Sequence, residues 1–156
     1  MSIDAQTFRK VLGSFASGVT VVTTIHPETG KPVGVTVSAF SSLSMDPPLV
    51  LFCLGTKTAS LPAFQENGHF CINVLSAGQQ DISNRFASKV EDKFAGIEVK
   101  TGTAGLPVLN GCIATMECRL VQTVNGGDHD IFIGEIVAAD YDMAVEPLIY
   151  VRGSYR

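Results

Sequence analysis

A run of small hydroxylated residues around an aromatic side chain is the segment of this sequence best suited to hold a flat ligand. Ser38, Ser41 and Ser42 surround Phe40, directly after a β-rich segment. Backbone donors and acceptors beside small side chains let a ligand approach closely, and an aromatic ring supplies an apolar wall. The plainer alternative is a serine-rich loop that joins two strands.

A second segment, Gly55-Thr-Lys-Thr-Ala-Ser60, has the composition of a phosphate site. It follows an apolar strand and opens a short predicted helix, and helix N-termini present free N–H groups and partial positive charge to an anion. Lys57 adds a full charge, and Thr58 or Ser60 can cap the helix or donate to a phosphate oxygen. The alternative is an ordinary capped helix beside a solvated lysine.

Motifs for several other chemistries are missing. No two glycines lie at positions i and i+2, so the Gly-x-Gly-x-x-Gly dinucleotide motif is absent, as are the Walker A loop, the nucleophile elbow and the His-Glu-x-x-His zinc motif. The three histidines, His26, His69 and His129, are too scattered to indicate a metal site. A nucleophilic Cys–His pair stays open, although no local motif supports one.

Composition narrows the class of protein. The chain has 156 residues, 46% of them apolar and 17% charged, which is typical of one folded domain (residues 1–156) rather than of a disordered segment. No apolar run approaches the ~20 residues that span a bilayer. The net charge of −4 and the absence of a basic block disfavour nucleic-acid binding. A phosphorylated ligand would therefore require the fold to gather its few cations in one place.

The cysteines and the N-terminus favour a reducing, cytoplasmic setting. Cys53, Cys71, Cys112 and Cys118 show no Cys-x-x-Cys spacing and lie in or beside apolar β-like segments, so we expect buried free thiols rather than disulfides or zinc ligands. The N-terminal segment has an early acid and no basic start followed by an apolar core, unlike a signal peptide.

Periodicity predicts a mainly β fold with a few helices. Helices are expected over residues 5–16, 58–66 and 77–87, the first with Asp4 as its N-cap and Gly18 as its end. Strands are expected over residues 19–25, 33–37, 49–54, 70–75, 113–124, 131–141 and 148–151, with 88–109 as a surface excursion. Asn125-Gly-Gly-Asp128 is a strong hairpin signal. Several short strands with few helices suggest a closed barrel with helical decorations, of the α+β kind.

Five segments in order resemble the short-chain flavin reductase family, the reductase components of two-component flavin-dependent monooxygenases. They are residues 15–24 (FASGVTVVTT), 34–54 (GVTVSAFSSLSMDPPLVLFCL), 69–75 (HFCINVL), 127–135 (GDHDIFIGE) and 148–155 (LIYVRGSY). Each segment alone is weak evidence, but together they span nearly the whole chain. The resemblance implies an FMN-binding split β-barrel, Greek-key-like, that works as a homodimer with its flavin sites at the subunit boundary.

The resemblance also implies where the ligands lie. The isoalloxazine ring would lie along Thr36, Val37, Ser38, Ala39, Phe40, Ser42 and Leu43, beside Cys53 and Leu54 on the next strand. The phosphate would lie at Lys57, Thr58 and Ser60, and Asn84, Arg85 and Phe86 would contribute near the ribityl-phosphate arm. Arg85 is equally well explained as a surface charge at a helix C-terminus.

His129 and Tyr155 are the residues that the resemblance associates with the nicotinamide. His129 follows the hairpin glycines and would face the nicotinamide side of the flavin, holding the carboxamide or a phosphate. Tyr155 is a second, weaker member of that site, because it lies near the end of the chain. Hydride transfer from NADH or NADPH to FMN or FAD needs no covalent or strongly basic side chain, so no catalytic residue is expected.

Three other interpretations stay open on sequence alone. One is a non-catalytic FMN carrier on the same fold, and another is a β-barrel that binds an unknown small ligand. The third, the pyridoxamine-phosphate oxidase type of split barrel, is disfavoured by the segments 38–44 and 127–129.

The apolar stripe Phe8, Val11, Leu12 and Phe15 is interpreted as core or dimer contact rather than as part of a cofactor site.

Overall fold

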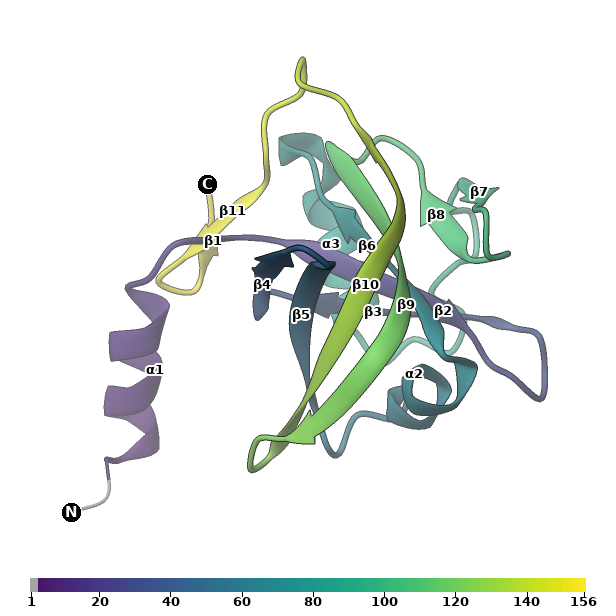
Figure 1. Cartoon of the computed structure of the whole chain (residues 1–156). Coiled ribbons are helices and arrows are strands. Elements are labelled where there is room, and N and C mark those ends of the chain that lie inside the picture. The colour runs from purple at the N-terminus through teal and green to yellow at the C-terminus, as the bar shows by residue number, and fades with distance from the viewer. Residues whose placement is uncertain (1–2) are drawn as a thin grey trace.

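The computed structural model describes residues 3–156, which form one large sheet with two small sheets and three α-helices around it (Figure 1). The helices are α1 (Ala5–Gly13), α2 (Leu61–Asn67) and α3 (Gln80–Ala87), and a 3-10 turn, η1 (Ala77–Gln79), leads into α3. The strands are β1 (Ser17–Gly18), β2 (Thr20–Ile25), β3 (Pro32–Val37), β4 (Phe40–Met45), β5 (Pro48–Gly55), β6 (His69–Val74), β7 (Val99–Thr101), β8 (Pro107–Leu109), β9 (Ala114–Asn125), β10 (His129–Tyr141), β11 (Ile149–Val151) and β12 (Ser154–Tyr155).

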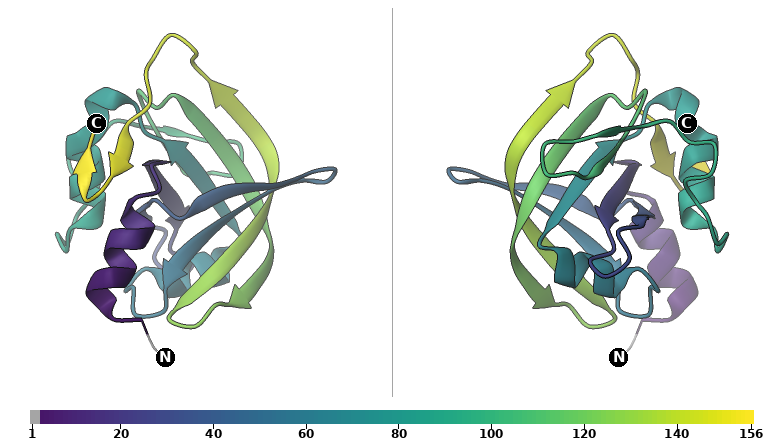
Figure 2. Two further views of the ribbon diagram at one scale, coloured as in Figure 1. Left: turned by 90° about the vertical axis from the view of Figure 1, so that its left-hand side faces the viewer. Right: turned by 90° about the vertical axis from the view of Figure 1, so that its right-hand side faces the viewer.

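The large sheet is antiparallel and curls into a split barrel. Its order is β3-β2-β6-β9-β10-β5-β4, so β3 and β4 are edges that do not pair with each other. Strands β5, β6, β9 and β10 have a Greek-key arrangement, because β6, β9 and β10 are neighbours in that order and β5, the first of the four in the chain, lies on the far side of β10. The curvature is visible in both views of Figure 2, where the β4–β5 hairpin also extends away from the rest of the sheet. The split barrel is confirmed, but the closed barrel suggested by strand periodicity is wrong.

Alternating side chains fill the barrel. Along β5, Val50, Phe52 and Leu54 are buried, while the residues between them face outward and are partly exposed. The ring of Phe52 stacks on Phe132 with centroids 4.9 Å apart and meets Phe70 edge-on at 5.0 Å. These contacts form the centre of a core that fixes β5 and β10 beside each other.

A second buried cluster joins the sheet to α3 and the C-terminal strands. It contains Val19, Val21, Leu75, Phe86, Leu109 and Leu148. Asn73 is buried beside it and is satisfied, because its amide donates to the Val21 carbonyl at 3.0 Å and accepts from the Leu109 N–H at 2.8 Å. The segment 88–109, expected as a surface excursion, forms the small β7–β8 sheet. Its last residue, Leu109, belongs to this buried cluster.

Helix α1 stands apart from the barrel (Figures 1 and 2). The Asp4 side chain accepts from the N–H groups of Gln6 at 3.0 Å and Thr7 at 2.9 Å, so the predicted N-cap is confirmed. The helix ends at Gly13 rather than at Gly18, because residues 17–18 pair with β11 instead. None of the α1 residues is buried within the chain.

The remaining differences from the sequence prediction are local. Helix α2 begins at Leu61, three residues later than expected, because residues 58–60 form a turn. The serine-rich segment after β3 is an edge strand, β4, that pairs with β5 rather than a loop. The predicted 125–128 hairpin is confirmed, with the Gly126 N–H donating to the His129 carbonyl at 2.8 Å.

Candidate functional site

A groove of about 1290 Å³ lies between β3, the turn that leads into α2, and the segment 86–95. Five of the residues that sequence reasoning assigned to a ligand site line it: Thr36, Lys57, Thr58, Ser60 and Phe86. Ligand pockets commonly have volumes of ~300–1,000 Å³, so the groove has room for a molecule of nucleotide size. Three separate parts of the chain therefore converge on one concave surface.

Positive charge is concentrated in this groove. Lys31, Lys57, Lys89 and Lys93 line it, which is four of the 11 lysines and arginines of the chain, against the acids Glu91 and Asp92. Lys93 is held in place, because its ammonium donates to the carbonyls of Phe86 at 2.8 Å and Gly34 at 3.3 Å. Its partial burial lowers the pKa of Lys93. A protein of net charge −4 has thus gathered cations where an anionic ligand could bind.

The turn between β5 and α2 supplies amide donors in place of a helix N-terminus. The expected helix start and the expected cap are wrong: the Leu61 N–H donates to the Thr58 carbonyl, residue 62 is proline, and the Ser60 side chain does not cap α2. Instead, among residues 3–156, no carbonyl or side chain accepts from the N–H groups of Lys57, Ala59 and Ser60. These three donors, with the Lys57 ammonium, remain available to phosphate oxygens.

The segment 36–43 lies at the corner where β3 passes into β4. The Thr36 hydroxyl donates to the Ser83 carbonyl at 2.6 Å, which ties β3 to α3. The Cys53 N–H donates to the Ala39 carbonyl at 2.9 Å, so this corner also packs along β5. Ser38, Ala39, Ser42 and Leu43 are exposed and Phe40 is partly exposed, so they can contact a ligand.

Three of the predicted site residues have buried side chains, including Phe86, which lies directly beneath the groove surface. Val37, Leu54 and Phe86 are buried in the two core clusters. Any contact from Val37 or Leu54 would have to come from their backbone atoms. Alternation along a strand explains the first two, since every second side chain of a barrel strand points into the core.

Cys53 lies on the outward face of β5 and is partly exposed. Partial burial of the Cys53 thiol raises its pKa. The side chain is therefore neutral at physiological pH, and it offers a small apolar surface rather than a nucleophile. The four cysteines are free; Cys71 and Cys118 are buried as expected, whereas Cys53 and Cys112 are only partly buried.

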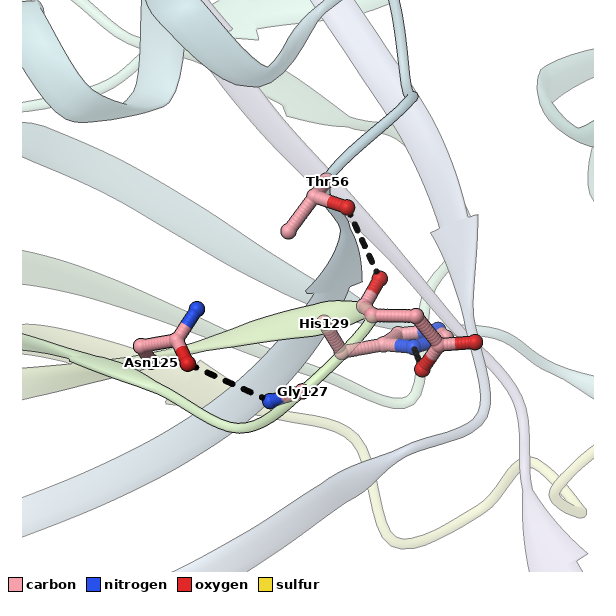
Figure 3. A network of polar contacts seen from close by, with 5 residues as sticks. Thr56, Asn125, Gly127 and His129 are labelled. Atoms are coloured by element: carbon pink, nitrogen blue, oxygen red, sulfur yellow. Dashed lines mark hydrogen bonds and ion pairs between the residues drawn. The ribbon is translucent and has the colours of Figure 1, made fainter.

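His129 begins β10 directly opposite Gly55, the last residue of β5. Its Nδ1 lies 2.8 Å from the carboxylate of Asp128, and Thr56 binds the Asp128 carbonyl through its N–H at 2.9 Å and its hydroxyl at 3.2 Å (Figure 3). The hydrogen bond from His129 lowers the pKa of Asp128, with smaller contributions from the charges of His129 and Lys57. The hairpin therefore places His129 beside the lysine-containing turn.

Asn84, Arg85 and Tyr155 meet on or near α3. The Tyr155 hydroxyl donates to the Asn84 side-chain carbonyl at 3.0 Å. Arg85 is already occupied, because its Nε donates to the Lys93 carbonyl at 2.7 Å and its Nη2 to the Asp92 carbonyl at 3.2 Å. These bonds hold the 92–93 wall of the groove, so the structure favours the alternative in which Arg85 is structural.

Sequence reasoning missed Lys31 and Lys93 as groove residues. Both lie far along the chain from Lys57, and neither is part of a motif. The requirement that an acidic protein gather cations locally was the one signal that pointed to them, but it could not say which lysines. The acceptors that fix Lys93 are backbone carbonyls, and no side-chain pattern marks them.

In residues 3–156, no group of three or more histidine, cysteine or acidic side chains could hold a metal ion. No helix in this range is long and apolar enough to cross a membrane.

Comparison with known proteins agrees on one family. The model of the flavin reductase like domain matches residues 12–156. The chain is 43% identical over 155 residues to the reductase subunit HsaB of a flavin-dependent monooxygenase from Mycobacterium tuberculosis, covering 98% of this chain and 82% of that one. It is 42% identical over 156 residues to a flavin reductase (NADH) from Kitasatospora aureofaciens, covering 98% and 81%.

Solved structures give the same result. An NADH:FAD oxidoreductase from Streptomyces globisporus, in complex with NAD and FAD fragments, superimposes with a TM-score of 0.92 at 34% identity, covering 100% of this chain and 95% of that one. A nitrilotriacetate monooxygenase component B homologue from Mycobacterium thermoresistibile gives a TM-score of 0.92 at 40% identity, covering 97% and 84%.

Proposed function

This chain belongs to the flavin reductase like family, and from that premise we propose that it reduces a flavin with NADH and supplies the reduced flavin to a partner monooxygenase. The observation that carries the proposal is the turn at residues 57–60. It combines three available amide donors and a lysine, it lines a cation-rich groove, and it lies next to His129.

The residues present suit a flavin phosphate and ring. The phosphate would bind the Lys57 ammonium and the N–H groups of the 57–60 turn, since charge-assisted hydrogen bonds are the stronger kind. The ring would lie along the β3–β4 corner, where Ser38 and Ala39 allow close approach of a ligand to the backbone and Phe40 offers an apolar surface. Rates of NADH and NADPH oxidation with FMN and with FAD distinguish the preferred flavin and nicotinamide.

Hydride transfer from nicotinamide C4 to flavin N5 is the chemistry that the two bound molecules supply. The protein binds and orients them. Backbone donors of the β3–β4 corner and the lysines of the groove would stabilise the negative charge that a bound flavin gains on reduction. No side chain is required to form a covalent bond or to act as a strong base.

We assign His129 to the nicotinamide. A carboxylate can only accept, so Nδ1 of His129 carries the proton that Asp128 binds. In the neutral ring, Nε2 is then an acceptor, and the carboxamide N–H of a nicotinamide is a suitable donor to it. Asp128 thereby selects the tautomer that can hold the carboxamide.

We also propose that the active form is a homodimer. Helix α1 presents Phe8, Val11 and Leu12 to solvent at 51%, 58% and 55% exposure, and Phe15, two residues after the helix ends, is 82% exposed. Four large apolar side chains so close together in the chain are rarely left uncovered in a soluble protein. A second copy of the chain, presenting the same surface, would cover them in the way that two-fold symmetric dimers do.

The competing function is a flavin carrier that binds flavin without reducing it. The histidine beside the phosphate turn favours the reductase, because a carrier has no need of a nicotinamide contact. The direct test is to follow NADH and NADPH oxidation at 340 nm with no flavin, FMN, FAD or riboflavin. We expect NADH oxidation that depends on added flavin. Tight flavin binding without NADH oxidation would instead establish the carrier.

A further inference from the structure

Tyr155 is part of a short chain of hydrogen bonds on α3. Its hydroxyl lies 2.9 Å from the Ser83 hydroxyl and donates to the Asn84 side-chain carbonyl at 3.0 Å. A phenol has one proton, and that proton is used on Asn84, so the Ser83 hydroxyl must donate to the Tyr155 oxygen. The bonds therefore run in one direction, from Ser83 through Tyr155 to Asn84.

Ser83 links these hydrogen bonds to β3, along which the flavin ring is proposed to lie. Its side chain is fully buried, and its carbonyl accepts the Thr36 hydroxyl at 2.6 Å. One residue of α3 thus contacts β3 through its backbone and Tyr155 through its side chain. Removing the Tyr155 hydroxyl would take away the acceptor of a buried donor, which is costly in a protein interior.

Tyr155 is held on a formed hairpin rather than on a free tail. Strand β12 pairs with β11, and the rings of Tyr150 and Tyr155 meet edge-on with centroids 5.2 Å apart. Arg152 and Gly153 have φ of 52° and 79°, the left-handed pair that a two-residue hairpin turn requires. The Arg152 N–H also donates to the Gly13 carbonyl at 2.7 Å, which fixes this hairpin to the end of α1.

We infer that Tyr155 is a positioning residue of the flavin site that acts through Asn84, rather than a contact of the nicotinamide. Because the Asn84 carbonyl oxygen is occupied by Tyr155, its NH₂ group is the end left to donate to a flavin oxygen. Without the tyrosine hydroxyl, the amide can rotate and turn its carbonyl toward an anionic ligand. The inference rests on the proposed function, since it concerns the same flavin site.

The first test is Tyr155→Phe, with Tyr150→Phe as the matched control. Both remove one hydroxyl from the same pair of rings, but only Tyr155 bonds to α3. Loss of one net hydrogen bond is worth ~1 kcal/mol, so the flavin Kd of Tyr155→Phe should rise about 5-fold while its KM for NADH stays unchanged. Flavin fluorescence titration and steady-state kinetics measure the two quantities. A raised KM for NADH with an unchanged flavin Kd would show a nicotinamide contact instead.

The second test is a double-mutant cycle with Asn84→Ala, a change at an exposed position of α3. If Tyr155 acts through Asn84, Tyr155→Phe should not weaken flavin binding further in the Asn84→Ala protein. A purely structural role of the hydroxyl would give additive losses, and additivity would overturn the inference. An unchanged flavin Kd in Tyr155→Phe would also overturn it. A wild-type protein that binds no flavin would instead remove the proposed function, and this inference with it.

Discussion

His129 and Asp128 are joined by a hydrogen bond of 2.8 Å between the imidazole Nδ1 and the carboxylate, at the first position of β10. The pair is exposed at the end of the sheet, beside the turn that holds Lys57. Thr56 fixes the backbone beside this pair, because it binds the Asp128 carbonyl through both its N–H and its hydroxyl.

The first prediction is that His129→Ala lowers kcat/KM for NADH by about 10- to 100-fold while flavin affinity stays nearly constant. One positioning contact is lost, but the hydride chemistry of the bound molecules remains. Stopped-flow reduction of pre-bound flavin by NADH gives the rate and the apparent NADH affinity separately. If both are the same as in the wild type, His129 does not belong to the nicotinamide site.

A second variant, Asp128→Asn, tests the role of the carboxylate that binds His129. The substituted amide can donate to Nδ1 as well as accept from it, so the preferred tautomer is no longer enforced. We expect a smaller loss in kcat/KM than in His129→Ala, and no further loss when the two changes are combined. An additive double variant would indicate that Asp128 acts independently of His129.

The second prediction concerns Lys57. Lys57→Ala should weaken FMN binding about 10- to 100-fold, since a charge-assisted hydrogen bond is worth roughly 1.5–3 kcal/mol. Riboflavin, which has no phosphate, should respond little. Lys10→Ala, a change of the same kind on exposed α1, is the control for general electrostatic effects. Equal losses for FMN and riboflavin would mean that Lys57 does not bind the phosphate.

Much of the fold and part of the site could be predicted from the sequence. The Asp4 cap, the 125–128 hairpin and most strands follow from local signals, because a capping carboxylate or an Asn-Gly-Gly turn acts within a few residues. Strand β4 was missed, because a serine-rich edge strand is fixed by pairing with β5 and not by its own composition.

The site shows the same division between local and tertiary information. Lys57 and His129 belong to local motifs and were identified, and the structure brings them together at the end of β5. Lys93 was not identified, because two backbone carbonyls hold it in the groove. The burial of Phe86 and Leu54 also depends on packing between distant segments, which a motif does not encode.

The third prediction is a loss of stability at alkaline pH that depends on Cys118. Burial raises the pKa of the Cys118 thiol from 9.0 to about 12, with a further contribution from the charge of Glu117. Above pH 9 the unfolded chain releases this proton while the folded chain keeps it, so the stabilisation is complete below pH 9 and falls as the pH rises toward 12.

The measurement is denaturant unfolding of the wild type and Cys118→Ala at pH 8 and pH 10. One thiol that ionises only when unfolded should make the wild type lose about 1.4 kcal/mol more than the variant over this interval. Comparing the two proteins cancels the contributions of tyrosines and lysines. Equal losses would show that Cys118 ionises as readily in the folded protein as in the unfolded one.

The last prediction is that the apolar face of α1, together with Phe15 just after it, holds two copies of the chain together. Phe8→Ser combined with Phe15→Ser should convert a dimer to a monomer at micromolar concentration, because each buried phenylalanine contributes ~1.5–3 kcal/mol to such an interface. The barrel should keep its stability, since α1 buries nothing within its own chain. Thr7→Ala combined with Lys10→Ala, on the same helix, is the control and should stay dimeric. Light scattering with and without FMN measures the mass. A wild-type protein that is monomeric under both conditions would contradict the proposed dimer, and a dimeric Phe8→Ser, Phe15→Ser protein would place the interface elsewhere.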